Sequence, residues 1–251
     1  MAKALVTGAS SGIGRDIAKE LAKRNIDLIL VSRDLDKLNE VKNQIQNVQV
    51  EVIAKDLNIE QNCKDLYEQV KEQKIDILIN NAGFGVFGKF TESPLEKELN
   101  MIKTNVVAMH VLTKLFLQKM EKENSGYILN VASIAGYMPG PLMAAYYSTK
   151  AYVVRLTQAI REELRRNKSN VKVGVLCPGP VDTNFNNVAG VKFKAKSLSS
   201  DYVAKYTVDK IMKKKFYIVP GVQIKAVRFF SKITPDNLLA KIAYNIQERK
   251  K

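Results

Sequence analysis

The chain has 251 residues, 46% of them hydrophobic, and a formal net charge of +15. This is an ordinary globular composition, and the chain is long enough for one α/β domain. The two cysteines, Cys63 and Cys177, form neither a zinc-site pattern nor a disulfide pattern, so we expect no metal. Most of the charge, +11, lies in residues 191–251 without a nucleic-acid-reading motif, so we expect no nucleic-acid partner.

Strand-like apolar residues begin almost at the first residue, and the sequence leaves no room there for a signal peptide. No uncharged apolar run is long enough to cross a bilayer. Together with the absence of a disulfide pattern, these features predict a cytoplasmic protein.

Short β-rich runs alternate with longer amphipathic ones along the chain. In chain order we expect the strand KALVT, a helix over 13–24, DLILV, a helix over 34–46, VQVEVIA, a helix over 60–73, DILIN, a helix over 94–121, YILNVA, a helix over 145–166, VKVGVLC and FYIVP. This alternation predicts βαβ units and a parallel sheet covered by helices on both faces.

We expect one domain over 1–251, because no linker or repeat divides the chain. Residues 184–215 are the least regular and are predicted to form a variable substrate loop or lid. Residues 216–251 contain the last strand and a basic C-terminal extension.

A glycine-rich turn, VTGASSGIG, joins the first predicted strand to the first predicted helix. Gly8, Gly12 and Gly14 allow a tight turn and let backbone N–H groups approach a pyrophosphate, whose charge the helix N-terminus stabilises. At the head of a βαβ unit this pattern predicts a dinucleotide site. It is not a P-loop, because no Lys-Ser or Lys-Thr pair follows the glycines.

Tyr146 and Lys150 lie four residues apart in the predicted helix over 145–166 and therefore face the same way. A free phenol has a pKa of about 10 and is a poor base at neutral pH. A nearby ammonium group favours the phenolate, so Tyr146 is the candidate general acid/base. Tyr147 and Tyr152 have no lysine four residues further on.

The chain resembles the short-chain dehydrogenase/reductase family, in its short single-domain form. The matching pieces, in the family's order, are TGASSGIG at 7–14, DL at 56–57, NNAG at 80–83, Asn105, Ser133, YYSTK at 146–150 and PGPVDT at 178–183. The resemblance implies a Rossmann-type doubly wound parallel sheet of seven strands, ordered 3-2-1-4-5-6-7. It also implies hydride transfer between a nicotinamide and a carbonyl or secondary alcohol, and we expect a homodimer or homotetramer.

The resemblance further implies a role for each matching residue. Tyr146 would exchange the proton, Lys150 would bind the nicotinamide ribose, Ser133 would donate to the substrate oxygen, and Asn105 would hold a water linked to Lys150. The residues it assigns to the cofactor are Gly8, Ser10, Ser11, Gly12, Ile13, Gly14, Ser32, Arg33, Asp56, Leu57, Asn81, Ala82, Gly83, Tyr146, Lys150, Pro178, Gly179, Val181 and Thr183.

The residues after the second strand favour NADP(H) over NAD(H). Ser32 occupies the place where NAD-preferring relatives usually have Asp, and Arg33 follows it, as suits a 2′-phosphate. Asp34 is one position further on, and Ser11 stands where many NADP-using relatives carry a second basic residue.

Apolar segments flank the reacting residues and favour an apolar carbonyl or alcohol over a sugar. They are IAGYMPGPLMAA, with Met138 and Met143, and FGVFGKF. A 3-oxoacyl thioester, a steroid-like ketone, a hydroxy acid and a small aldehyde stay open as substrates. Two interpretations stay open for Lys192, Lys194 and Lys196. They would bind an anionic group of the substrate, or they would face water in a solvated loop. The alternative function is a catalytically silent nucleotide-sensing regulator on the same fold.

The basic extension contains QIKAVRFFSKIT, which as a helix would place Lys225, Arg228 and Lys232 opposite an apolar face with Phe229 and Phe230. Two interpretations fit residues 222–234. The apolar face covers the substrate pocket or a subunit interface, which we favour, or the helix makes a weak peripheral contact with an anionic membrane.

Overall fold

The computed structural model describes residues 2–185, 189–190 and 197–248. The first half of the chain contains β1 Lys3–Thr7, α1 Gly12–Ala22, β2 Asp27–Ser32, α2 Leu35–Asn43, β3 Val50–Ala54, α3 Glu60–Val70, β4 Ile77–Asn80, α4 Leu95–Ile102, the π-helical turn η1 Lys103–Ala108 and α5 Met109–Lys122. The second half contains β5 Tyr127–Val131, the 3₁₀ turn η2 Ile134–Tyr137, α6 Ala144–Arg166, β6 Lys172–Leu176, β7 Val181–Asp182, β8 Leu198–Ser199, α8 Ser200–Met212, β9 Tyr217–Ile218, α9 Val222–Phe230 and α10 Asp236–Glu248.

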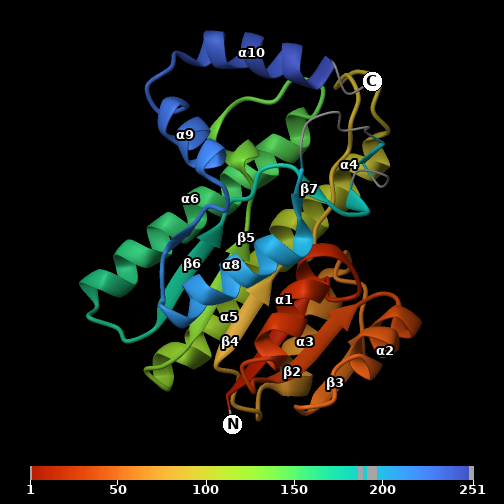
Figure 1. Cartoon of the computed structure of the whole chain (residues 1–251), viewed down its shortest axis with the longest axis vertical. Coiled ribbons are helices and arrows are strands. Elements are labelled where there is room, and N and C mark those ends of the chain that lie inside the picture. Colours follow the sequence, from red (N-terminus) through yellow and green to blue (C-terminus); the bar gives the residue numbers. More distant parts are fainter. Residues whose placement is uncertain (1, 186–188, 191–196, 249–251) are drawn as a thin grey trace.

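Seven strands form one parallel sheet in the order β3-β2-β1-β4-β5-β6-β9, which confirms the predicted topology (Figure 1). The short strands β7 and β8 pair separately after β6. Buried β1 and β4 lie in the middle of the sheet, with nearly continuous apolar sequences, because both faces are covered. The order reverses between β1 and β4, where ligands bind in sheets of this kind.

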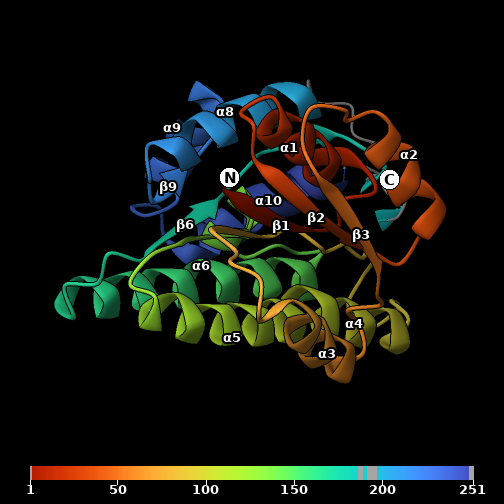
Figure 2. The same ribbon diagram turned by 90° about the horizontal axis from the view of Figure 1, so that it is seen from below.

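Helices cover both faces of the sheet (Figure 2). On one face, α3, α5 and α6 bury a core that includes Leu66, Phe116 and Val153. On the other, α1, α2 and α8 bury a second core that includes Leu21 and Leu38. Both layers are therefore built on apolar stripes at helical spacing.

Two predicted elements differ from the structure. The helix expected over 94–121 is divided by the π-helical turn Lys103–Ala108, which contains Asn105. The segment 184–215 is less irregular than expected, because Ser200–Met212 forms helix α8, which buries Val203, Thr207 and Ile211 on one stripe. Helix α8 therefore forms the end of the predicted segment 184–215, whose role as a variable substrate loop or lid stays a prediction.

The C-terminal extension forms two helices, and the faces of the first differ in part from the expected ones. Helix α9 has no fully buried residue, and the side chains of Phe229 and Phe230 are 62% and 58% exposed, whereas Ile224 packs against the core. Whether the exposed apolar residues meet a subunit interface or a membrane stays a prediction. Arg228 turns inward, with its guanidinium 3.7 Å from the centroid of the Tyr217 ring. None of the helices in the described ranges is both long and apolar enough to span a membrane.

Candidate active site

The residues predicted for the site follow the strands at one edge of the sheet. Because the strands are parallel, their carboxyl ends meet there. This common edge holds the turn after β1, Ser32 at the end of β2, Asn81 after β4, Ser133 after β5 and Pro178 after β6.

The glycine turn packs tightly against the end of β4. A Cβ added to Gly14 would lie 2.4 Å from the Gly8 carbonyl oxygen and from Nδ2 of Asn81, so only glycine fits. Gly8 has a φ of +64°, in the left-handed region that favours glycine. Asn81 Nδ2 donates to the Thr7 and Gly8 carbonyl oxygens, at 3.0 and 3.2 Å. The turn therefore presents the N-terminus of α1 at the sheet edge, as a pyrophosphate site requires.

The remaining residues of this turn are consistent with that arrangement. Ser11 is the N-cap of α1 and makes no side-chain capping bond. Ser10 is half-buried beside it, and Ile13 packs against the core under α1. Thr183 approaches from the far side, since its Cγ2 would lie 3.1 Å from a Cβ on Gly12. Thr183 and the glycine turn thus face each other, as two walls of a nucleotide site would.

The carboxylate of Asp34 is already engaged. Asp34 caps α2 by accepting from the Lys37 N–H at 3.0 Å, and it forms an ion pair with the Lys37 ammonium at 2.7 Å. Ser32 Oγ lies 3.2 Å from both the nitrogen and the oxygen of the Asp34 backbone. Arg33 is exposed. Arg33, which has no hydrogen-bond partner or ion pair among the described residues, therefore stands at the end of β2, and the carboxylate of Asp34 is turned toward its own helix.

Tyr146 and Ser133 are brought together, although they come from α6 and from the end of β5. Tyr146 is buried, and Ser133 is near enough to its hydroxyl to act on the pKa of Tyr146. Burial raises the pKa of Tyr146 above its ordinary value, and Ser133 opposes that effect. The direction is opposite to the depression expected from Lys150, because desolvation outweighs the other influences. In the chain alone, Tyr146 is a protonated acid.

Lys150 is a buried cation below the Tyr146 ring. Its Nζ lies 5.8 Å from the ring centroid and donates to the Val131 carbonyl oxygen at 3.0 Å. Burial lowers the pKa of Lys150 to about 8. The side chain passes close to Gly83, where an added Cβ would be 3.5 Å from Nζ. The Lys150 side chain thus extends beneath the Tyr146 ring to the sheet edge at Gly83.

The Lys150→Met variant should report this buried charge as a pH-dependent stability. Between pH 8 and the ordinary lysine pKa of 10.5, the folded chain holds fewer protons on Lys150 than the unfolded chain, so folding becomes more favourable as pH rises. Relative to Lys150→Met, the free energy of unfolding of the unmodified chain should therefore increase by about 3 kcal/mol from pH 7 to pH 10.5. Urea unfolding of both proteins across this range measures it. A pH-independent difference would contradict the buried cation.

Asn105 anchors the loop after β4 to α6. Its Oδ1 accepts from the Phe84 N–H at 3.0 Å, and its Nδ2 donates to the Phe84 carbonyl at 2.9 Å and to Thr149 at 3.1 Å. The side-chain amide is therefore already bonded within the protein. One-turn π segments such as Lys103–Ala108 occur frequently at functional sites, and here the segment carries Asn105 toward Gly83. The water predicted at Asn105 stays a prediction.

The other predicted cofactor residues lie around the same edge. Asp56 accepts from the Asn58 N–H at 3.0 Å, and Leu57 beside it is buried. The Ala82 N–H donates to Thr7 Oγ1 at 3.0 Å. Pro178 accepts from the Ile134 N–H at 2.9 Å, and Val181 is buried in the β7–β8 pair. Gly179 lies against α9, since an added Cβ would be 2.3 Å from Ile224 Cδ1.

An apolar cluster surrounds Tyr146. Its members are Met101, Ala135, Met143, Ala189, Phe84, Val86, Phe87, Ala145, Tyr147 and Phe185. The Phe185 ring is 5.4 Å from that of Tyr146, centroid to centroid. Sequence reasoning expected the apolar character and Met143 but missed Phe185, because it lies in an irregular segment with no periodic signal. Thr7, which accepts from Asn81 and Ala82, lies inside the glycine motif and could have been found there.

Some predicted features lie outside the described residues or away from this edge. Lys192, Lys194 and Lys196 lie outside the described residues. Within residues 2–185, 189–190 and 197–248, no group of three or more His, Cys, Asp or Glu is placed to hold a metal ion. Cys63 and Cys177 are buried free thiols, and burial raises their pKa to about 11 and about 12, so neither is a thiolate near neutral pH.

Sequence comparisons identify relatives over most of the chain. The family model of short chain dehydrogenases matches residues 2–192. An uncharacterized oxidoreductase of Staphylococcus epidermidis is 35% identical over 228 residues, which cover 89% of this chain and 96% of the relative. Very-long-chain 3-oxoacyl-CoA reductase of Mus musculus is 37% identical over 173 residues, which cover 64% of this chain and 54% of that enzyme.

Solved structures share the whole fold. A short-chain dehydrogenase from Sphingobium yanoikuyae in complex with NADPH superposes with a TM-score of 0.85 at 27% identity, covering 93% of this chain and 92% of the other. A short-chain dehydrogenase/reductase from Burkholderia phymatum in complex with NAD gives a TM-score of 0.83 at 27% identity, with coverages of 90% and 92%. Both neighbours hold a nicotinamide cofactor.

Proposed function

This chain belongs to the short chain dehydrogenase family of oxidoreductases, and we propose that it is an NADP(H)-dependent reductase of apolar carbonyl compounds with Tyr146 as general acid/base. In the direction of reduction, the bound nicotinamide supplies a hydride to the carbonyl carbon. Tyr146 gives its proton to the carbonyl oxygen, and Ser133 donates a hydrogen bond to the same oxygen. Lys150 would bind the ribose of the cofactor, and it holds positive charge beneath the phenol.

The observation that carries this proposal is the meeting of Ser133, Tyr146 and Lys150 at the edge where the glycine turn also ends. A structural tyrosine would not need a hydroxyl partner at the end of β5 and a buried ammonium below its ring. Burying a lysine is unfavourable, so a fold that retains one beside a phenol at a nucleotide edge favours a chemical role. A nucleotide sensor would have no need of this arrangement.

The preference for NADP(H) rests on the end of β2. Asp34, the acid nearest in sequence to Ser32, is held by Lys37 and by its own helix cap. Arg33 is exposed there, and guanidinium groups bind phosphate through paired hydrogen bonds. Neighbours of similar fold hold NADPH or NAD, so the family alone leaves the choice open.

NADPH should exceed NADH by at least about tenfold in kcat/KM, and Arg33→Asp should erase or reverse that ratio. A tenfold ratio is about 1.4 kcal/mol, which one charge-assisted contact supplies. Steady-state assays with both cofactors measure it. Arg155→Asp, which makes the same charge change at an exposed position on α6, should leave the ratio unchanged. Equal use of NADPH and NADH by the unmodified chain would contradict the role of Arg33.

The apolar cluster around Tyr146 supports an apolar substrate. Met143 and Phe185 present flexible and aromatic surface beside the phenol, as a pocket for an alkyl chain or ring system requires. One relative is named for very-long-chain 3-oxoacyl-CoA, a 3-oxoacyl thioester. We place 3-oxoacyl thioesters and bulky apolar ketones ahead of hydroxy acids and small aldehydes.

The test is the consumption of NADPH, followed by absorbance, with 3-oxoacyl thioesters of increasing chain length, a steroid-like ketone and a small aldehyde. A hydroxy acid, which is already an alcohol, is tested by the formation of NADPH from NADP+. Activity that rises with apolar surface supports the substrate class. Preference for the small aldehyde overturns the proposed apolar substrate class but is consistent with the proposed carbonyl reduction. Tight NADPH binding without turnover of any carbonyl overturns the reaction itself. The cytoplasmic location and the homodimer or homotetramer stay predictions.

A further inference from the structure

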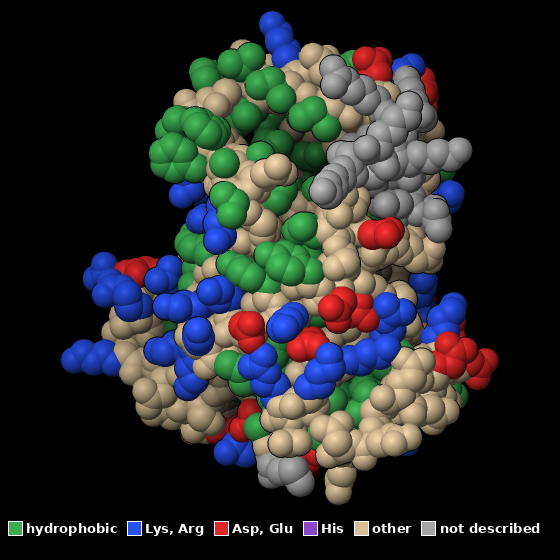
Figure 3. Space-filling view, viewed as in Figure 1, with side chains coloured by type: hydrophobic (Ala, Val, Ile, Leu, Met, Phe, Trp, Pro, Cys, Tyr) green, Lys and Arg blue, Asp and Glu red, His purple; other side chains and the backbone are tan. Residues whose placement is uncertain are grey.

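The outward faces of α9 and α10 form one apolar surface, which we call the α9–α10 face. Its members share exposure of at least 41% and are Val222, Val227, Phe229, Phe230, Ile233, Leu238, Ile242 and Ile246. Hydrophobic side chains gather over these two helices in the space-filling view (Figure 3). In α10 the exposed residues Leu238, Ile242 and Ile246 recur every fourth position, beside the buried stripe Leu239 and Ala243.

Helix α9 places one charged side chain on its inner side and two aromatic side chains on its outer side, although Ile224 also packs inward against the core. Its charged Arg228 faces inward, stacked on Tyr217 and 5.2 Å from the centroid of Tyr137, with a buried Nε that has no hydrogen-bond partner among the described residues. Its two phenylalanines face outward, packed edge to face against each other with centroids 5.6 Å apart. Water favours the reverse orientation, so an apolar environment on the outer side is the condition that suits this helix.

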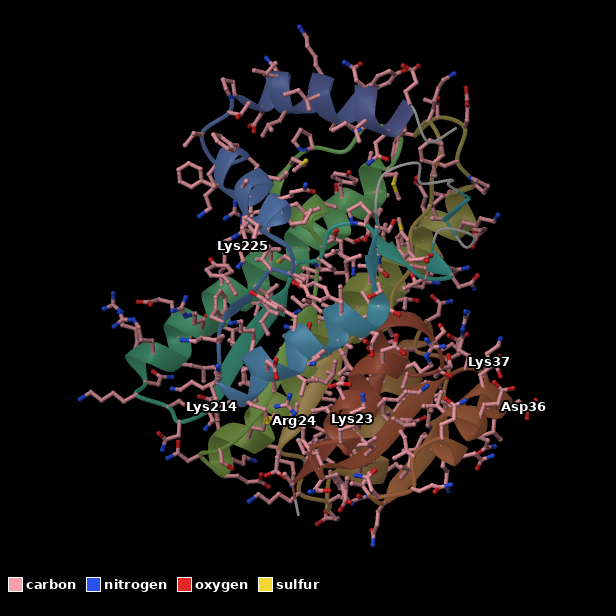
Figure 4. The ribbon with its side chains drawn as sticks, viewed as in Figure 1. Lys23, Arg24, Asp36, Lys37, Lys214 and Lys225 are labelled. Carbon is pink, nitrogen blue, oxygen red and sulfur yellow. The ribbon has the colours of Figure 1, made fainter. Side chains whose placement is uncertain are left out.

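Positive charge accompanies the α9–α10 face. Lys225, Lys232 and Lys241 are exposed on the two helices and the turn between them, and Lys225 lies at the side of α9 (Figure 4). A second copy of the chain docked by this face around a two-fold axis would bring the lysines of both copies together. Anionic lipid headgroups would instead meet the lysines while the phenylalanines entered the boundary of the acyl region. The charge therefore favours a membrane over a second copy.

We propose that the α9–α10 face docks on the surface of an anionic lipid bilayer. Both helices also contact the candidate active site: Ile224 of α9 lies against Gly179, and Gln247 of α10 donates to the Tyr147 hydroxyl, next to Tyr146. Docking would hold the apolar cluster around Tyr146 close to the bilayer, where apolar substrates concentrate. The docking does not depend on the proposed function; only this consequence for substrate delivery does.

The experiment is co-sedimentation of the full chain with vesicles of phosphatidylglycerol and phosphatidylcholine, and with vesicles of phosphatidylcholine alone. We expect pelleting that needs the anionic lipid and decreases as salt rises, because the attraction of the lysines is screened. The double variant Phe229→Ser and Phe230→Ser should reduce the bound fraction at least about tenfold, since most of the buried aromatic area is lost. Ile59→Ser with Met212→Ser removes two exposed apolar side chains elsewhere and should bind as the unmodified chain does.

Circular dichroism and NADPH binding are measured to check that both double variants are folded. Absence of pelleting at low salt overturns the proposal. So does equal pelleting of the phenylalanine variant. A lipid-independent change in sedimentation coefficient on loss of Phe229 and Phe230, with pelleting unchanged, assigns the face to a second copy instead. None of these results bears on turnover, so the membrane proposal and the proposed reaction fail separately.

Discussion

Tyr146→Phe should lower kcat by at least about 10³-fold while NADPH binds within a few-fold of its normal affinity. The change removes only the hydroxyl group, which in the proposed mechanism gives its proton to the substrate oxygen beside Ser133. The ring stays packed beside Phe185 and above Lys150, so the shape of the site is preserved. Single-turnover and steady-state assays, with NADPH binding followed by fluorescence, separate the chemical step from cofactor binding.

The adjacent residue provides a matched control. The Tyr147 ring packs against Gly140, and its hydroxyl accepts from Gln247 of α10, away from Ser133. Tyr147→Phe also removes one buried phenolic hydroxyl but should keep most of the activity. If Tyr146→Phe retained about a third of the turnover, the acid would be a different group. If both variants lost activity equally, the tyrosine pair would have a packing role in common.

The fold could be predicted from the sequence because its signals are local. The alternation of β-rich and amphipathic runs indicated every strand of the main sheet, and the spacing of Tyr146 and Lys150 placed both on one helix face. The glycine turn could be interpreted because only glycine readily adopts the backbone conformation of Gly8 and only glycine fits at Gly14. These features depend on neighbours in sequence or on backbone geometry that only glycine adopts.

The missed features depend on contacts between distant segments. The inward turn of Arg228 requires the rings of Tyr137 and Tyr217, and no helical pattern within 222–234 reveals those partners. Phe185 meets Tyr146 only after β6 and α6 have packed. The direction of the Tyr146 pKa follows from burial, which the i, i+4 relation with Lys150 does not include. Sequence patterns therefore predicted residues that the fold gathers at one sheet edge, but not the direction of the Tyr146 pKa shift.

Ser133→Ala should lower kcat by about 10²- to 10³-fold, the usual loss when one donor to a developing oxyanion is removed. In the structure Ser133 Oγ also accepts from the Ala135 N–H at 3.2 Å and lies 3.4 Å from the Pro178 carbonyl oxygen. Those two contacts begin the turn Ile134–Tyr137 and are structural. The variant thus tests whether the hydroxyl acts on the substrate or only on the backbone.

The two roles of Ser133 give different results in the same set of assays. A purely structural role would lower thermal stability and NADPH affinity along with kcat. The fold-decrease in kcat would then be no larger for slow substrates than for fast ones. A role in catalysis would leave stability and NADPH affinity nearly unchanged, because the 3₁₀ turn is short and one capping bond contributes only about 1 kcal/mol. Ser133→Thr, which keeps a hydroxyl on the same carbon, should then recover part of the lost kcat. A Thr variant as inactive as the Ala variant, with both losing NADPH affinity, would assign Ser133 to the backbone alone.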